Sequence, residues 1–331
     1  MPATTAPTTG SAPTTAQLAA TLSAIAYLGP VPVNELRRYE MNRALDKTAE
    51  GWQIVWGPVT AGEDLMYVAQ NGSASQYALA VRGTLITRIE NVIDDLAVAT
   101  MVTPSFSLGS SFANAQISSG AQQVWNNLSA ATPGPGLGKG TVLEFFQAVS
   151  GDYSLLVTGH SLGGQTAQLL APWLAQALGT AAQVQLVTMA APTAGDQAFA
   201  AGIDAAFGQS GTITGYYNTL DVVPMLWADL GAITSMYQGG PACGSLCKHA
   251  VDHMIKRLAD KGIVYVQPTS REACAGSLYS ISSINPLPFE AEVLDQHNAH
   301  YYMYFVGVQL GTIQQLDSKW EPPSSQTIAV G

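Results

Sequence analysis

The sequence has little charge, and what charge it has is mostly of one sign. Only 11% of its 331 residues are Asp, Glu, Lys or Arg, and the formal net charge is -10. A chain with this acidic balance lacks the basic surface that binds nucleic acid, and anionic membranes do not attract it electrostatically. Any contact with lipid must therefore be apolar.

Long apolar runs are also missing, since none approaches the roughly 18–20 residues that span a bilayer. The first 15 residues are rich in Ala, Thr and Pro and lack the cationic start and apolar core of a signal peptide. We expect a disordered tail over 1–15, one domain over 16–320 and a short tail over 321–331. A secreted protein with its leader removed fits this pattern better than a cytoplasmic one, although the pattern does not fix the compartment.

The sequence contains only three cysteines: Cys243, Cys247 and Cys274. One thiol stays unpaired whichever two join, so at most one disulfide can close the segment 240–275. The first two cysteines also lie near His249 and His253, which invites a zinc interpretation. Such a compact run lacks the loop that separates the ligand pairs of structural zinc sites. We therefore expect neither a metal nor an organic cofactor.

One stretch of the chain has the pattern of a nucleophile. Residues 153–158 are short, β-prone and largely apolar, and good helix formers follow from residue 164. Between them stands G-x-S-x-G, whose glycines permit the tight turn that exposes Ser161 above the edge of a sheet. The turn places Ser161 at the start of a helix, where the backbone N–H of Leu162 can donate to a developing oxyanion.

Strand patterns alternate with helix patterns along the chain, which indicates an α/β fold with a mostly parallel sheet covered on both faces. Two β-type runs at 65–69 and 77–81 flank a turn-like Asn-Gly-Ser and predict an antiparallel hairpin. Further strands are expected at 52–56, 183–189 and 212–218. The carboxyl ends of such strands are where a site gathers.

A nucleophilic serine needs a histidine that takes its proton and a carboxylate that orients the histidine. In sheets of this type the chain order is Ser, acid, His. Asp221 is the leading acid because it follows a predicted strand among apolar neighbours, and Asp229 is weaker. Of the five histidines, two remain plausible as the base, at the start of a predicted final helix: His297 and His300.

Five motifs stand in a recognisable order. They are R-G-T at 82–84, I-x-N-x-x-x-D-L at 89–96, G-H-S-L-G-G at 159–164, P-x-x-G-D-x-x-F-A at 192–200 and N-x-x-D-x-V-P at 218–224. Together they resemble the class 3 lipases, a family that includes fungal triacylglycerol lipases and feruloyl esterases. The resemblance implies an α/β-hydrolase with a helical lid and a serine carboxylester hydrolase activity.

The resemblance also implies roles for individual residues. Ser161 would attack the ester, Asp221 would orient the base, and the backbone N–H groups of Thr84 and Leu162 would form the oxyanion hole. The fungal pattern L-D-H-x-x-Y-F is not met here. A looser bacterial-like form, E-H-S-M-x-x-Y-L, aligns with 296–303 and favours His297 as the base, with His300 as the alternative.

The segment after the predicted oxyanion loop is amphipathic, and in the resembling lipases it is a lid. As a lid, this segment would turn its aliphatic face over the site or transiently toward a lipid surface. The alternative is that the segment is an ordinary surface helix. The lid candidates are Leu85, Ile86, Ile89, Val92 and Ile93. The acyl-pocket candidates are His160, Val223, Met225, Leu226, Tyr301 and Tyr302. The expected substrate is an acylglycerol or another apolar ester; the alternatives are a feruloyl-type esterase and a non-catalytic lipid-binding member of the fold.

Overall fold

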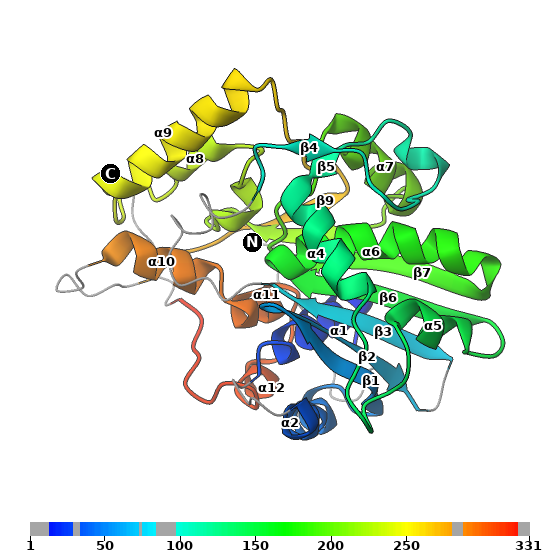
Figure 1. The fold of residues 1–331 in the computed structure, drawn as a ribbon. Coiled ribbons are helices and arrows are strands. Elements are labelled where there is room, and N and C mark those ends of the chain that lie inside the picture. Colours follow the sequence, from blue (N-terminus) through cyan, green and yellow to red (C-terminus); the bar gives the residue numbers. More distant parts are fainter. Residues whose placement is uncertain (1–12, 29–33, 73–74, 84–96, 280–286, 324–331) are drawn as a thin grey trace.

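The computed structural model describes residues 13–28, 34–72, 75–83, 97–279 and 287–323, and these form an α/β fold around one large sheet (Figure 1). Within those ranges, no helix combines the length and the apolar character needed to cross a bilayer.

The large sheet has seven strands in the order β1-β2-β3-β6-β7-β8-β9. They are β1 (Trp52–Ala61), β2 (Asp64–Asn71), β3 (Gln76–Arg82), β6 (Tyr153–His160), β7 (Ala182–Met189), β8 (Gly215–Asn218) and β9 (Arg271–Cys274). The first three strands are antiparallel, and all the pairings from β3 to β9 are parallel. The predicted hairpin and the mostly parallel sheet are therefore confirmed. A separate two-stranded sheet joins β4 (Met101–Val102) to β5 (Ile117–Ser118).

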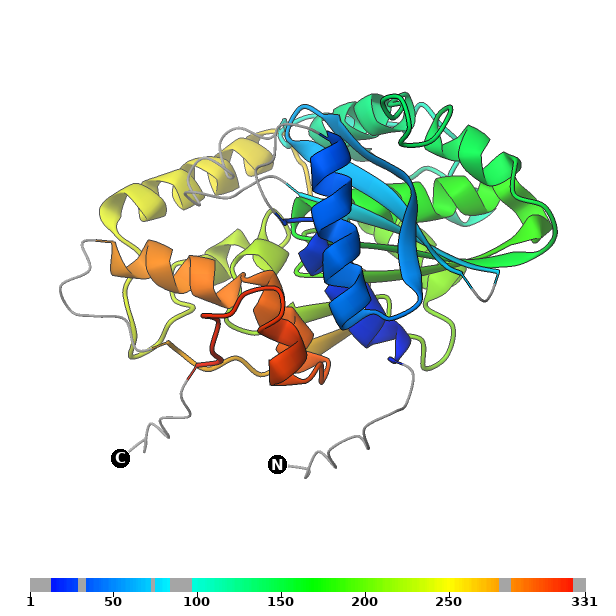
Figure 2. The same ribbon diagram turned by 90° about the horizontal axis from the view of Figure 1, so that it is seen from below.

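Helices cover both faces of the sheet. On one face lie α4 (Ser119–Ser129), α5 (Val142–Gln147), α6 (Leu162–Leu178) and α7 (Gln197–Phe207). On the other lie α1 (Thr15–Ile25), α2 (Asn34–Thr48), α11 (Ala299–Phe305) and α12 (Leu310–Ile313), which Figure 2 shows as the blue and red helices nearest the viewer. Successive side chains of a strand point to opposite faces, so Leu79 and Val81 join the first core while Ala78 and Ala80 join the second.

A third apolar cluster lies beyond the carboxyl ends of the strands. It is built from α8 (Leu230–Ile233), α9 (Ser245–Asp260) and α10 (Pro288–Gln296), the helices grouped around one end of the sheet in Figure 1. Leu162 and Val222, which follow β6 and β8, belong to this cluster. The cluster therefore packs directly against the edge where the predicted site residues emerge.

Cys243 and Cys247 form a disulfide at the start of α9, which leaves Cys274 as the free thiol. The expected disulfide thus closes a short loop instead of a long segment. Because both of its sulfurs are bonded to each other, neither thiol can be a zinc ligand in this state, and the zinc interpretation is wrong.

The N-terminal helix α1 is embedded in the second core. Thr14 caps it, because the Thr14 side chain accepts from the N–H of Gln17 at 3.2 Å and the Gln17 side chain accepts from the N–H of Thr14 at 2.9 Å. Buried hydrogen bonds fix its position: the Ser23 hydroxyl lies 3.0 Å from that of Thr158, and the Tyr67 hydroxyl donates to the Leu22 carbonyl at 2.7 Å. The helix is thus part of the fold's interior.

Candidate active site

Ser161 occupies the turn between β6 and α6 in a strained backbone conformation. Its φ is 61° and its ψ is -137°, a region that costs a residue with a side chain about 1–3 kcal/mol. The turn closes because only glycine fits beside it: a Cβ at Gly159 would lie 2.3 Å from the Gly163 carbonyl oxygen, and one at Gly163 would lie 2.3 Å from the Val81 carbonyl oxygen. The strand–turn–helix geometry of a nucleophile elbow is therefore present.

The first turn of α6 lies against the end of β3. A Cβ at Gly83 would stand 2.8 Å from the backbone nitrogen of Leu162, so these two backbones are as close as they can be. The N–H of Leu162 has no acceptor within its own helix, as expected at a helix start. The other predicted oxyanion donor, Thr84, lies outside the described residues, as do the lid candidates Leu85, Ile86, Ile89, Val92 and Ile93.

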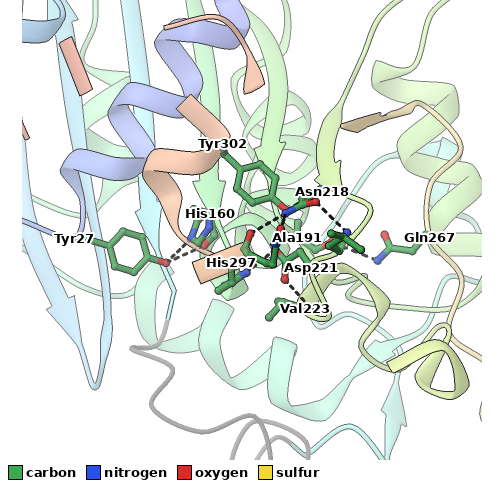
Figure 3. A network of polar contacts seen from close by, with 11 residues as sticks. Tyr27, His160, Ala191, Asn218, Asp221, Val223, Gln267, His297 and Tyr302 are labelled. Carbon is green, nitrogen blue, oxygen red and sulfur yellow. Dashed lines mark hydrogen bonds and ion pairs between the residues drawn. The ribbon is translucent and has the colours of Figure 1, made fainter. Parts of the chain in front are cut away.

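Asp221 follows β8 and is completely buried, yet three donors satisfy its carboxyl group (Figure 3). Oδ1 accepts from the backbone N–H of Val223 at 2.9 Å. Oδ2 lies 2.8 Å from Nδ1 of His297 and accepts from the hydroxyl of Tyr302 at 2.7 Å. A buried carboxylate persists only with such partners, because an unpaired one would lose its hydration without compensation.

His297 is the histidine that the structure pairs with Asp221. Since Nδ1 of its ring faces the carboxyl group, Nε2 is the nitrogen available to accept a proton. Within the described part of the chain, this Nε2 and the Oγ of Ser161 are both buried and have no hydrogen-bond partner. The ring centroids of His297 and His160 are 4.5 Å apart, and His160 directly precedes Ser161. His297 thus lies beside the turn that carries Ser161.

His297 does not lie at the start of a final helix, as the sequence had suggested. It caps the end of α10, and Asn298 begins α11 by accepting from the N–H of His300 at 2.9 Å. His300 therefore points elsewhere: its ring lies 6.3 Å from that of Trp320, centroid to centroid. Asp229 is exposed at the start of α8 with no side-chain cap bond. The alternative base and the weaker acid are both absent from the Asp221 cluster.

A chain of buried polar groups supports Asp221 from behind. The Tyr302 hydroxyl accepts from the backbone N–H of Asn218 at 2.9 Å. The Asn218 side chain donates to Oε1 of Gln296 at 2.6 Å, and Gln296 in turn donates to Glu292 at 2.7 Å. These contacts tie the end of β8 to α10 and α11, so the elements that hold the acid and the base are fixed to one another. The sequence analysis missed Gln296 and Glu292 because nothing local to α10 indicates that they are buried.

The model of the family described as "Lipase (class 3)" matches residues 78–230, which include Ser161 and Asp221. This segment is similar to the class 3 lipase family. The crystal structure of M37 lipase superimposes with a TM-score of 0.78 at 24% identity, covering 92% of this chain and 98% of that one. This likeness shows that the shared fold extends beyond the residues that the family model matches.

Other solved lipase structures match over a shorter part of the chain. The lipase of Rhizomucor miehei in complex with its propeptide matches with a TM-score of 0.44 and 25% identity, covering 64% of this chain and 62% of that one. A triacylglycerol lipase of Penicillium expansum matches with a TM-score of 0.44 and 21% identity, over 66% and 75% of the two chains. No curated protein sequence matches the chain.

The acyl-pocket candidates stay predictions, and the two tyrosines among them have other contacts in the structure. Tyr302 supports Asp221 from the protein interior, and the buried Tyr301 hydroxyl accepts from the N–H of Ser277. The other candidates do not line the cavity of about 20 Å³ beside the elbow either: His160, Val223, Met225 and Leu226. Within the described ranges, that cavity is lined by Asp64, Val98, Ser118, Gly120, Ala121, Val124, Leu162, Gln165, Thr166 and Trp227. The third cluster buries Val223 and Leu226, which follow Asp221.

Asp64 and Trp227 bring polar groups to the wall of this cavity. Burial raises the pKa of Asp64 to about 6, and Arg82 opposes the effect. Trp227 is buried with a φ of 67°, and its Nε1 finds no acceptor among the described residues. The wall of the cavity beside Leu162 thus combines apolar side chains with the polar groups of Asp64, Ser118, Gln165 and Thr166.

Proposed function

We propose that the protein is a serine carboxylester hydrolase that cleaves acylglycerols or other apolar acyl esters through an acyl-enzyme intermediate. The observation that carries the proposal is the buried Asp221–His297 pair beside a strained serine whose Oγ is unpartnered within the described residues. Serine is a poor nucleophile unless such a pair takes its proton.

In the proposed mechanism, Ser161 Oγ forms a bond to the ester carbonyl carbon while its proton passes to Nε2 of His297. The carbonyl oxygen becomes an oxyanion that the N–H groups of Leu162 and Thr84 stabilise. The Asp221 carboxylate offsets the charge of the imidazolium. The proton then moves to the leaving alcohol as the C–O bond breaks, and water, activated by the same histidine, releases the acid.

The surroundings of the site favour an uncharged, apolar substrate. The wall of the cavity beside Leu162 includes Val98, Val124 and Trp227, and the formal net charge of -10 disfavours anionic esters. We also propose that the protein works outside the reducing cytoplasm. The Cys243–Cys247 disulfide supports this location, because disulfides persist in oxidising compartments.

A fluorophosphonate probe and a panel of esters test the proposal. We expect stoichiometric labelling at Ser161, located by peptide mass spectrometry, and faster hydrolysis of tributyrin and p-nitrophenyl butyrate than of methyl ferulate. Labelling with methyl ferulate as the preferred substrate would point to a feruloyl-type esterase. A folded protein that stays unlabelled would be a lipid-binding member of the fold and would refute the proposal.

Tyr302→Phe should weaken both the fold and the activity. The change leaves Asp221 Oδ2 with one donor fewer and the buried N–H of Asn218 without its acceptor. Each loss of this kind costs about 1–3 kcal/mol, so we expect a clear fall in the free energy of unfolding and a kcat lowered about tenfold. Urea unfolding and p-nitrophenyl butyrate kinetics measure the two effects. Tyr304→Phe, at an exposed position of the same helix, is the control and should change neither.

A further inference from the structure

Tyr27 joins the N-terminal segment to the nucleophile elbow. It follows α1 directly, and its hydroxyl donates to the backbone carbonyl of His160 at 3.2 Å. The same hydroxyl lies 3.1 Å from Nδ1 of the His160 ring, and the two rings meet edge to face at 5.4 Å between centroids. One side chain therefore holds both the main chain and the side chain of the residue before Ser161.

His160 in turn lies between Tyr27 and the base. In Figure 3 its ring stands between those of Tyr27 and His297, and its centroid is 4.5 Å from that of His297. It also contacts the ring of Tyr302 edge to face at 5.6 Å. A shift of the His160 ring would thus open space beside His297, whose other side is fixed by Asp221.

The charge state of His160 suits this position. Burial lowers its pKa well below the usual range, and the neighbouring His297 lowers it further. The ring is therefore neutral when His297 becomes an imidazolium, so the base does not meet a second positive charge. Burial raises the pKa of Tyr27, although the backbone N–H of Gly83 opposes this, so its hydroxyl stays protonated and able to donate.

We propose that Tyr27 and His160 are a positioning pair that sets the relative placement of Ser161 and His297. Residues ahead of the family-matched segment 78–230 thereby take part in catalysis. The inference rests on the proposed function, because it assumes that Ser161 and His297 carry out the chemistry. It gives Tyr27 an indirect role, with no contact to the substrate required.

Tyr27→Phe tests the proposal, with Tyr67→Phe as the matched control. Both changes delete a tyrosine hydroxyl that bonds a backbone carbonyl, but the Tyr67 hydroxyl bonds Leu22, within α1, whereas that of Tyr27 bonds His160. We expect Tyr27→Phe to lower kcat for p-nitrophenyl butyrate about 3- to 30-fold, the effect of one hydrogen bond, with KM unchanged within twofold. The rate of fluorophosphonate labelling should fall in parallel. Tyr67→Phe should lower the melting temperature and leave kcat and the labelling rate unchanged.

A double-mutant cycle extends the test to His160. His160→Asn keeps a polar atom near the position of Nδ1 but removes the ring that packs on His297. If the two residues act as a pair, the double variant Tyr27→Phe/His160→Asn should have a kcat close to that of His160→Asn alone, because a shared effect is lost only once.

Equal kcat values for Tyr27→Phe and the parental enzyme, or equal losses for Tyr27→Phe and Tyr67→Phe, would overturn the inference while leaving the proposed function intact. Multiplicative losses in the cycle would also overturn the pairing. Failure of the proposed function is separately visible, since the parental protein would then stay unlabelled or Ser161→Ala would retain the parental activity.

Discussion

Ser161→Ala is expected to lower kcat for p-nitrophenyl butyrate about 10⁴- to 10⁶-fold and to abolish fluorophosphonate labelling. The substitution removes the attacking atom but leaves the Asp221–His297 pair in place. Because the Ser161 Oγ has no hydrogen-bond partner among the described residues, its loss removes no stabilising bond. The free energy of unfolding should therefore stay the same or rise slightly, as measured by urea titration.

Ser23→Ala provides the contrasting control. The Ser23 hydroxyl is buried and lies 3.0 Å from that of Thr158, three residues before Ser161. Its removal should cost about 1 kcal/mol of stability with little effect on kcat. Parental turnover by purified Ser161→Ala would show that another residue is the nucleophile.

His297→Ala should be nearly as damaging as the loss of the nucleophile, whereas His300→Ala should change kcat less than threefold. The difference follows from geometry, because only the ring of His297 reaches Asp221. Removal of a triad histidine costs about 10⁴- to 10⁶-fold in turnover, leaving the contribution of binding and the oxyanion hole. Steady-state kinetics of the two variants at one pH, with circular dichroism to establish folding, measure the effect. A reversed order of the two losses would mean that the base is His300.

Local patterns of the sequence were sufficient to predict the tight turn at Ser161 and the position of Asp221 after a strand. The elbow depends on two glycines within five residues, and Asp221 stands directly after its strand, so both are specified by neighbours in the chain. The hairpin of β2 and β3 was predictable for the same reason. Strand β9 was missed, because two of its four residues are charged and its pairing with β8 is set at long range.

The arrangement around the base depends on residues far apart in sequence. Asp221 and Tyr302 are 81 positions apart, and Tyr27 and His160 are 133 apart, so no window of the sequence shows that they meet. The sequence predicted that His297 stands at the start of one helix, whereas the structure has it between α10 and α11. The capping role of Asn298, which separates the two helices, is visible only once the turn is formed. The tyrosines after His297 suggested a pocket wall. In the structure both are buried, and the Tyr302 hydroxyl donates to Asp221 while that of Tyr301 accepts from Ser277.

The seating of α1 also has a consequence for how the protein is made. This helix packs against α11, and the side chain of Gln17 donates to the carbonyl of Gly307 at 3.0 Å, across 290 positions of the chain. During synthesis the beginning of a domain leaves the ribosome first, at about 5–20 residues per second. We therefore expect the face of α1 that packs against α11 to stay exposed until the segment through residue 307 has emerged from the ribosome. Ester hydrolysis should begin only at that stage of translation, because His297 arrives with the same segment.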